Sequence, residues 1–300
     1  MKKIFAILTL LLLVITATAQ QLPQYSQYML NSYVINPSTA GETDYCEARS
    51  NNRYQWVGFT DAPRTYILSV QGPTKSKKVG LGGYLFTDIV GPTRRIGAYF
   101  SYAYHLQLSD QYKVSMALNA GLLQYTVDGS KIAMNDPGDL AVSNGLQSVL
   151  MPDFGFSSYL YRKDKKFFVG VSIMQLGQKV KFFEYQTNPL SKLVPHFFLT
   201  GGYNFYLNND FTIQPLAIVK YVFPAPVQLE LGARVIYKDK LWIGGNFRTQ
   251  DAYSALIGFT YRDGLSFGYS YDFTITNVKK YSVGTHEIMI AIRFNKAEKK

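Results

Sequence analysis

Cysteine and histidine are scarce in this 300-residue chain, and their scarcity excludes several kinds of site. Cys46 is the only cysteine, so no intramolecular disulfide can form and thiolates cannot complete a zinc site. The three histidines, His105, His196 and His286, lie far apart and show no metal-ligand spacing. The sequence also contains no Walker-type phosphate loop. It therefore indicates no enzymatic activity, no cofactor and no metal ion.

Charge and long apolar runs are also in short supply. Charged residues make up 17% of the chain, against about 25% in a typical soluble protein. Beyond residue 19, no stretch approaches the roughly 18 apolar residues of a membrane-spanning helix. Aromatic residues instead reach 15%, which excludes a disordered chain. The composition indicates a β protein, either a large soluble sandwich or an outer-membrane barrel.

The first nineteen residues have the pattern of a cleaved export signal. Lys2 and Lys3 form a positive start, residues 4–15 are apolar, and residues 17–19 read Ala-Thr-Ala, a typical cleavage site. We therefore predict a signal peptide over 1–19. Its removal lowers the formal net charge from +11 to +9. That excess of positive charge would suggest nucleic-acid binding in a cytoplasmic protein, but an exported chain makes nucleic acid an unlikely partner.

Apolar and small polar residues alternate along most of the chain from Asp44 onward. In the stretch 265–276, for example, large apolar side chains take the odd positions, and Ser, Gly, Asp and Thr take the even ones. A soluble sandwich would place many Lys and Glu on its outer face. An apolar face opposite a small polar face is typical of lipid outside and lumen inside. We predict an all-β fold, a transmembrane antiparallel β-barrel over residues 44–294.

Turn signals divide this region into about fourteen strands, an even number as in bacterial single-chain barrels. Most reach the roughly 9–11 residues that a tilted strand needs to cross a bilayer. The predicted strands are 44–54, 64–73, 78–88, 93–107, 112–127, 152–162, 167–177, 194–207, 211–222, 226–237, 240–250, 252–262, 264–276 and 283–294.

The connections between predicted strands alternate in length. Short, mostly charged turns follow the even-numbered strands, whereas the long connections 128–151 and 178–193 follow odd-numbered ones. In outer-membrane barrels the short turns are periplasmic and the longer loops extracellular. This predicts an outer-membrane protein of a Gram-negative bacterium with both termini in the periplasm and a basic periplasmic tail, 295–300. The predicted periplasmic rim is basic at Lys75, Lys77, Lys78, Arg162, Lys163, Lys165, Lys166, Lys238, Lys240, Lys296, Lys299 and Lys300.

Charged residues also occur at inward-facing positions of the late strands. Because charges shielded from bulk water must be paired, we expect them to form a cross-strand network that fills the lumen. The predicted lumen network comprises Glu230, Arg234, Arg248, Asp272, Glu287 and Arg293.

The segment 20–43, which precedes the first predicted strand, lacks strand alternation and is rich in Gln, Tyr and Asn. We expect it to be a periplasmic segment that folds against the periplasmic opening and inner wall as a plug. It contains the motifs Pro-Gln-Tyr-Ser-Gln-Tyr-Met at 23–29 and Asn-Pro-Ser-Thr-Ala-Gly at 36–41. A third motif, which begins Arg-Tyr-Gln-Trp-Val-Gly-Phe, occupies 53–65.

These three ordered motifs resemble the signature of the PorP/SprF family of the type IX secretion system. The family pattern reads P-Q-[YF]-[ST]-Q-Y-M, then N-P-x-x-A-G, then R-x-Q-W-x-G-F-x-x-A-P-x-T; only Thr60-Asp61 departs mildly from it. The matching residues expected to serve the plug or partner contacts are Gln24, Tyr25, Gln27, Tyr28, Asn36, Pro37 and Gly41. Those of the expected first-loop motif are Arg53, Gln55, Trp56, Gly58, Ala62 and Pro63.

The resemblance implies a non-enzymatic barrel that assists the secretion or surface attachment of cargo proteins, such as gliding adhesins with a C-terminal signal domain. It also implies contacts with outer-membrane lipids, periplasmic ring components and a peptidoglycan-linked lipoprotein. The residues by themselves leave an alternative open, an outer-membrane channel for small or hydrophobic solutes whose N-terminal segment serves as a hatch. A purely structural outer-membrane protein is a third reading.

Overall fold

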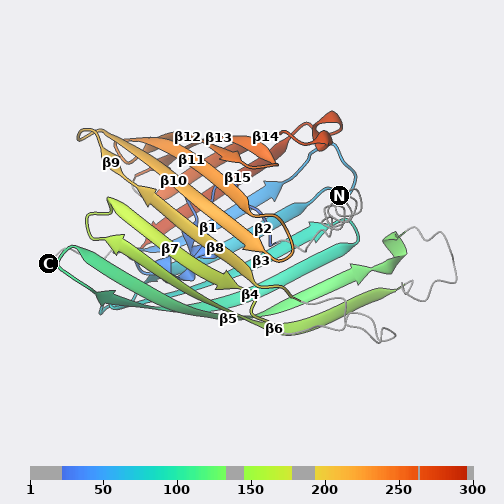
Figure 1. Ribbon diagram of the computed structural model, residues 1–300, viewed down its shortest axis with the longest axis horizontal. Coiled ribbons are helices and arrows are strands. Elements are labelled where there is room, and N and C mark those ends of the chain that lie inside the picture. The colour runs from blue at the N-terminus through green and yellow to red at the C-terminus, as the bar shows by residue number, and fades with distance from the viewer. Residues whose placement is uncertain (1–21, 133–144, 178–192, 263, 296–300) are drawn as a thin grey trace, which may run out of the picture.

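A computed structural model describes residues 22–132, 145–177, 193–262 and 264–295 of the chain. Nearly all of these residues lie in long antiparallel strands that surround a central lumen (Figure 1). The strands are β1 (Cys46–Tyr54), β2 (Arg64–Pro73), β3 (Val79–Val90), β4 (Thr93–Gln107), β5 (Tyr112–Asp128), β6 (Leu146–Arg162), β7 (Phe167–Met174), β8 (His196–Tyr203), β9 (Phe205–Tyr206), β10 (Phe211–Val222), β11 (Gln228–Tyr237), β12 (Leu241–Arg248), β13 (Ala252–Tyr261), β14 (Leu265–Thr274) and β15 (Thr285–Phe294).

The sheet closes on itself, because β15 pairs with β1 and every other strand pairs with its neighbours in sequence. The short β9 continues β8, since both pair in succession with β10. The barrel therefore has fourteen strands around its wall, which confirms the predicted fold. The largest difference is β6, which begins at Leu146 rather than 152, because its first residues extend the pairing with β5 to Asp128.

The two faces of the wall differ as the alternation predicted. On β4, for example, Phe100 and Tyr102 face outward and are half-exposed, whereas Ser101 and Ala103 face inward and are fully buried. Large apolar side chains cover the outside of the other strands in the same way, including Leu118, Ile243 and Phe273. The outer surface is thus suited to lipid, and polar groups are kept for the lumen.

The two ends of the barrel are distinguished by their connections. At one end, the turn end, the short connections 74–78, 108–111, 163–166, 207–210, 238–240 and 262–264 join consecutive strands. The opposite end, the loop end, carries the connections between β5 and β6 and between β7 and β8 (Figure 1). Parts of the predicted loops 128–151 and 178–193 lie outside the described residues.

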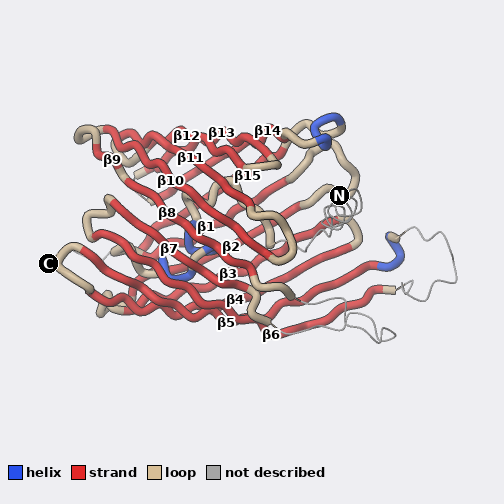
Figure 2. Tube along the Cα trace, in the orientation of Figure 1, coloured by secondary structure: helices blue, strands red, loops and turns tan. Residues whose placement is uncertain are grey.

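The described helices are short. The α-helix α2 (Ser32–Ile35) and the 3-10 helix η1 (Pro37–Thr39) precede β1, whereas η2 (Gly129–Lys131) and η3 (Asn277–Lys280) belong to loop-end connections (Figure 2). None of these helices, the only ones in the described ranges, is long and apolar enough to span a membrane.

Candidate functional site in the barrel lumen

Residues 22–45, here called the internal segment, run along the lumen from the loop end to the turn end. The backbone N–H of Leu22 donates to Nε2 of His196 (3.1 Å), the first residue of β8 at the loop end. The backbone N–H of Gly41 donates to Oε1 of Gln71 (2.9 Å), near the turn-end terminus of β2. The internal segment therefore follows the inner wall along most of the lumen.

This path differs from the expected plug at the periplasmic opening. The described chain begins at the loop end and finishes at the turn end, where β15 ends, so its two described ends lie at opposite ends of the barrel. The expectation of a segment against the periplasmic opening and inner wall, with both termini on one side, is thus corrected in one respect: residues 22 and 295 lie at opposite ends. The physical reason is that polar groups of the segment, such as those of Ser26 and Asn36, have their partners deep in the lumen.

Close packing fixes the internal segment against β3 near the turn end. A Cβ placed on Gly80 would lie 1.8 Å from the carbonyl oxygen of Ala40, so only glycine allows this approach. Gly41 has a φ of +76°, a conformation that favours glycine. Tyr33 packs over Gly82, and its hydroxyl donates to Oγ of Ser101 (3.0 Å). The segment is therefore seated by backbone contact as well as by side chains.

The residues of the first two family motifs all lie in this segment. Nε2 of Gln24 donates to Oε1 of Gln228 (3.0 Å), and Nε2 of Gln27 donates to the carbonyl oxygen of Glu287 (2.9 Å). Tyr25 packs beside the aromatic cluster around Tyr84 and Tyr99.

The other motif residues hold the middle of the internal segment. Tyr28 is buried with Ile35. Oδ1 of Asn36 accepts the backbone N–H of Ser38 (3.1 Å), which caps η1, while Nδ2 of Asn36 donates to the carbonyl oxygen of Ser158 on β6 (3.2 Å). Pro37 is the first residue of η1, where its missing N–H costs nothing.

Five charged side chains from five strands meet near the loop end and form a network, here called the loop-end network: Arg53, Glu230, Arg248, Asp272 and Glu287. Nη2 of Arg53 lies 2.8 Å from Oδ2 of Asp272, and its Nη1 lies 3.3 Å from Oε2 of Glu287. Nε of Arg248 lies 3.0 Å from Oε2 of Glu230. All five side chains are almost completely buried, so each charge depends on its partners in the network.

Ser26 of the internal segment lies at the centre of the loop-end network. Its hydroxyl donates to Oδ2 of Asp272 (2.6 Å) and accepts from both Nη1 of Arg53 (2.9 Å) and Nη2 of Arg248 (3.1 Å). Its backbone N–H donates to Oε2 of Glu287 (2.7 Å). The segment and the network therefore stabilise each other.

Two members of the predicted network lie elsewhere. Nε of Arg234 donates to the amide oxygen of Gln214 (2.6 Å), and Nε of Arg293 lies 3.5 Å from Oε2 of Glu47. Both arginines face the lumen, but they lie four and six residues from Glu230 and Glu287 on the same strands. At about 3.3 Å per residue this places them more than about 13 Å closer to the turn end. The prediction of one six-membered network is corrected to two separate levels.

Residues 17–292 match the family described as type IX secretion system membrane protein PorP/SprF. The chain belongs to the PorP/SprF family. The resemblance read from the three motifs is therefore confirmed, and with it the identity of the chain as a membrane component of the type IX secretion system. Family and fold together place the protein in the outer membrane.

Solved structures of similar fold are other barrels. The CymD monoaromatic hydrocarbon channel has a TM-score of 0.51 and 12% identity, over 90% of this chain and 92% of the channel. The toluene transporter TbuX of Ralstonia pickettii has a TM-score of 0.50 and 10% identity, over 87% of this chain and 92% of the transporter. At this identity the likeness shows the fold alone. Among curated proteins, none matches the sequence.

The third PorP/SprF motif divides between the lumen and the first loop. Arg53, expected to anchor the loop, is instead the lumen-facing residue of β1 in the loop-end network. Gln55 and Pro63 close the base of the loop by a backbone hydrogen bond of 2.9 Å. Ala62 immediately precedes Pro63.

The tip of this first loop packs against the connection that precedes β15. The backbone N–H of Trp56 donates to Oγ1 of Thr285 (3.0 Å), and Val57 exchanges backbone hydrogen bonds with residues 283 and 284. Gly58 has a φ of +110°, and a Cβ there would lie 3.1 Å from the carbonyl oxygen of Tyr281. The motif thus joins two neighbouring loop-end connections.

The sequence-based prediction of the lumen network omitted Arg53, a member of the loop-end network, and Ser26, which lies at its centre. The family pattern admits only Ser or Thr at position 26, and both residues supply a hydroxyl. Arg53 follows Asn51 by two residues, so both face the same side of β1, and Nδ2 of Asn51 donates to Oε1 of Glu287 (3.1 Å). The hydroxyl residue at position 26 and the two-residue spacing of Asn51 and Arg53 are visible in the sequence, but only the structure shows that they meet.

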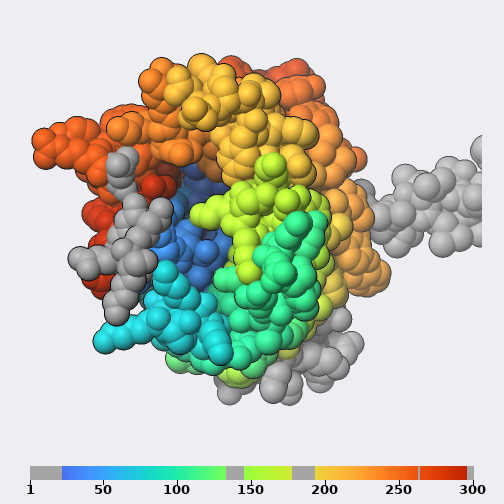
Figure 3. Space-filling view, turned by 90° about the vertical axis from the view of Figure 1, so that its left-hand side faces the viewer, coloured from blue at the N-terminus to red at the C-terminus, as the bar shows by residue number. Residues whose placement is uncertain are grey.

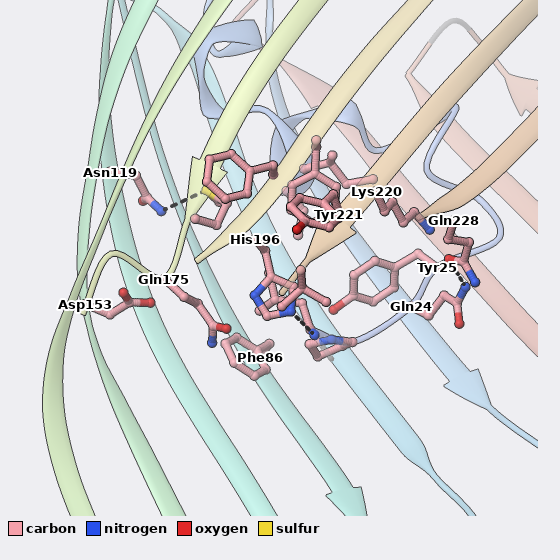
Figure 4. Close-up of a pocket in the computed structure, with 18 of the residues that line it drawn as sticks. Gln24, Tyr25, Phe86, Asn119, Asp153, Gln175, His196, Lys220, Tyr221 and Gln228 are labelled. Carbon is pink, nitrogen blue, oxygen red and sulfur yellow. Dashed lines mark hydrogen bonds between the residues drawn. The ribbon is translucent and has the colours of Figure 1, made fainter. Parts of the chain in front are cut away.

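A small pocket lies beside the start of the internal segment (Figure 4). It has a volume of about 80 Å³ and lies between residues 22–25 and the walls formed by β3, β8 and β10. Its lining is mostly apolar, with Phe86, Tyr221 and Pro23 among the contributors, whereas Lys220 and Gln228 supply polar groups. Such a lining suits a small apolar molecule better than an ion.

A larger cavity of about 560 Å³ lies at the turn end between the internal segment and the opposite wall. Figure 3 looks into the turn-end opening, and the N-terminal part of the described chain, in blue, is visible inside the barrel. Glu42 of the internal segment lines the cavity; burial raises the pKa of its carboxyl group, while Lys165 and the Tyr159 hydroxyl oppose that rise. In the described ranges, no group of His, Cys, Asp and Glu side chains is arranged to hold a metal ion.

Proposed function

We propose that this PorP/SprF protein is a non-enzymatic accessory of type IX secretion that assists the export or surface attachment of cargo proteins. The observation that carries the proposal is that the chain's own internal segment passes through the lumen and is bound there. A pore for free diffusion needs an open lumen. A barrel that holds its own segment in place is better suited to docking other components than to conducting solutes.

Two groups of contacts support a lumen that stays occupied. At the loop end, the carboxylates of the loop-end network accept charge-assisted hydrogen bonds, the stronger kind, from Ser26 and from the backbone N–H of Gln27. In the second group, Tyr33 and Ala40 pack in an aromatic cluster with Tyr84 on β3. Releasing the segment would remove the hydrogen bonds that Ser26 and Gln27 make to the buried charges of the loop-end network, although the ion pairs between the strands would remain, so release is costly.

The proposed orientation places the turn end in the periplasm and the loop end outside the cell, because short turns are periplasmic in outer-membrane barrels. The turns 74–78, 163–166 and 238–240 then present lysines to the periplasm. We propose that this basic rim contacts the periplasmic ring components and the peptidoglycan-linked lipoprotein. A tag inserted in 163–166 should be inaccessible on intact cells. Surface labelling of that tag would show that the barrel has the opposite orientation.

The decisive test of the accessory role is deletion of residues 22–40 in the full chain. The barrel should still assemble, because no strand is lost, but single-channel conductance should rise and cargo should no longer reach the cell surface. The undeleted barrel, measured in parallel, should show little steady current. Normal cargo delivery by the deleted protein would contradict the proposal, whatever its conductance.

A channel for small apolar solutes is the second candidate. The mostly apolar pocket of Figure 4 favours it, as does the fold shared with a hydrocarbon channel and a toluene transporter. In this role the internal segment would act as a hatch. Saturable binding of toluene by the purified barrel, together with faster toluene uptake by cells that produce it, would favour the channel. Neither is expected if the protein is an accessory.

A further inference from the structure

Three arginines line the turn-end cavity from three strands: Arg49 on β1, Arg234 on β11 and Arg293 on β15. Each lies within four residues of the turn-end terminus of its strand, so the three share one level of the lumen, and we call them the turn-end arginines. They bring three positive charges to a space that the internal segment leaves open.

The turn-end arginines have few acidic partners. Glu47 accepts from Arg49 and also lies beside Arg293, at 3.5 Å from its Nε. Arg234 donates to the neutral amide of Gln214 and makes no ion pair with any described residue. Nε and Nη1 of Arg49 are buried and find no hydrogen-bond partner within the described ranges. These two atoms are closed off from the cavity, so Arg49 lines it through the remaining tenth of its side chain that is exposed, and brings its positive charge to the cavity wall.

The arrangement also contains repulsion. Arg49 and Arg234 lie close enough for their positive charges to oppose each other, although they come from strands that do not pair. The other charged groups that line the cavity are Glu42, Lys165 and Asp239. Lys165 lies close enough to Glu42 to stabilise its charge, and Asp239 lies in an exposed turn at the mouth. A negative group placed between Arg49 and Arg234 would relieve their repulsion.

We propose that the turn-end cavity binds a carboxylate group between Arg49 and Arg234. Guanidinium groups bind carboxylates through paired, parallel hydrogen bonds, which makes arginine the suited residue for this recognition. The cavity volume of about 560 Å³ lies in the range of small-ligand sites, roughly 300–1,000 Å³. Apolar side chains such as Leu216 and Trp242 also line it, so the carboxylate is carried by an organic molecule.

The carboxylate has two available sources, a free small dicarboxylate or a glutamate side chain of a peptide that enters through the turn-end opening. Isothermal titration of the purified full barrel in detergent would use glutarate, a capped peptide with two glutamates, and the same peptide with two glutamines. We expect the glutarate or the glutamate peptide to bind, and the glutamine peptide not to bind. Tighter binding of the glutamate peptide than of glutarate identifies the source as a peptide, and the reverse order identifies a small molecule.

The variants Arg234→Gln and Arg49→Gln should each weaken this binding by about tenfold or more, because a hydrogen bond to a charged group contributes roughly 1.5–3 kcal/mol. Arg94→Gln makes the same substitution at an exposed position near the loop-end start of β4 and should leave affinity unchanged. Heat-modifiable migration on gels checks that each variant is folded. The proposal is overturned if no carboxylate probe binds, if both cavity arginine variants bind as the native barrel does, or if Arg94→Gln loses as much affinity. Because the assay uses the isolated barrel, its failure would leave the proposed role in secretion standing.

Discussion

The loop-end network and the turn-end arginines share three strands, β1, β11 and β15, but their charges are paired differently. At the loop end, Arg53 and Arg248 pair with four carboxylates, since Asp251 also lies 2.9 Å from Nη1 of Arg248, and both arginines contact the internal segment. At the turn end, three arginines face one strand carboxylate, that of Glu47. At one level of the lumen charges of both signs are paired, whereas the other carries an excess of positive charge.

The course of the internal segment explains the difference. At the loop end its Ser26 lies within the network and completes it. Towards the turn end the segment lies against the opposite wall, where Ala40 approaches Gly80 of β3 and Ser38 donates to Ser157 of β6 (3.0 Å). The same short stretch of chain therefore completes one charged level and leaves the other open. The structural role of the loop end and the proposed binding role of the turn end are thus separated along the axis of the barrel.

Reversing the charge of Glu287 should have the largest effect on this comparison. Glu287→Lys places a cation beside Arg53 and removes the acceptor of the Ser26 backbone N–H, at a cost of about 3–5 kcal/mol or more. Most of the protein should fail to form the heat-modifiable barrel on gels. Asp110→Lys, in an exposed turn, is the matched control and should migrate normally. A stable Glu287→Lys barrel would show that water reaches the loop-end network.

Replacing one arginine at each level compares the two levels directly. Arg248→Met leaves Glu230 and Asp272 short of a buried partner and should lower the free energy of unfolding by about 3–5 kcal/mol. Arg234→Met removes a charge that has no ion pair among the described residues and repels Arg49, so it should change stability by less than about 1 kcal/mol. Urea unfolding in lipid measures both. Equal losses of unfolding free energy in the two variants would mean that the two levels do not differ in how much their arginines stabilise the barrel.

Removing the Ser26 hydroxyl tests the link between segment and network. Ser26→Ala deletes a donor to Asp272 and an acceptor for both arginines, which should cost about 3 kcal/mol because the groups left behind are charged and buried. Ser76→Ala, in an exposed turn, should have no measurable effect. Urea unfolding of the two variants gives the comparison, and Ser26→Thr should restore stability because it keeps the hydroxyl.

The smallest effect is expected where the internal segment meets β3. Gly80→Ala would force a Cβ against the carbonyl oxygen of Ala40, so the segment must shift, at a cost of about 1–3 kcal/mol. Limited proteolysis should cut the internal segment faster in this variant. In Gly201→Ala the nearest atom to the new Cβ lies at 3.7 Å, and the cutting rate should match that of the native barrel. Unchanged proteolysis of Gly80→Ala would mean that this contact does not hold the segment.

The strands and their faces were readable from the sequence because alternation along a strand is a local property. The stretch 93–107 coincides with β4, and the even positions of 265–276 proved to be the buried ones on β14, as for Ser266, Ser270 and Asp272. The lumen-facing charges could be predicted for the same reason. Residues two positions apart on a strand face the same side, so the small polar neighbours of a charged residue show that it faces the lumen. The start of β6 was missed because only pairing with β5 extends the strand to Leu146.

The sequence by itself determined the barrel, its strand number, the residues that face the lumen and the family. Only the tertiary structure decided which of those residues meet. The register between strands sets Glu230 opposite Arg248 and Arg53 opposite Glu287, and no local pattern contains that alignment. The path of the internal segment depends on contacts such as Ser26 with Glu287, which join the two ends of the chain. Such contacts are decided by the pairing of charges in three dimensions, because a buried charge is stable only where its partner lies within reach.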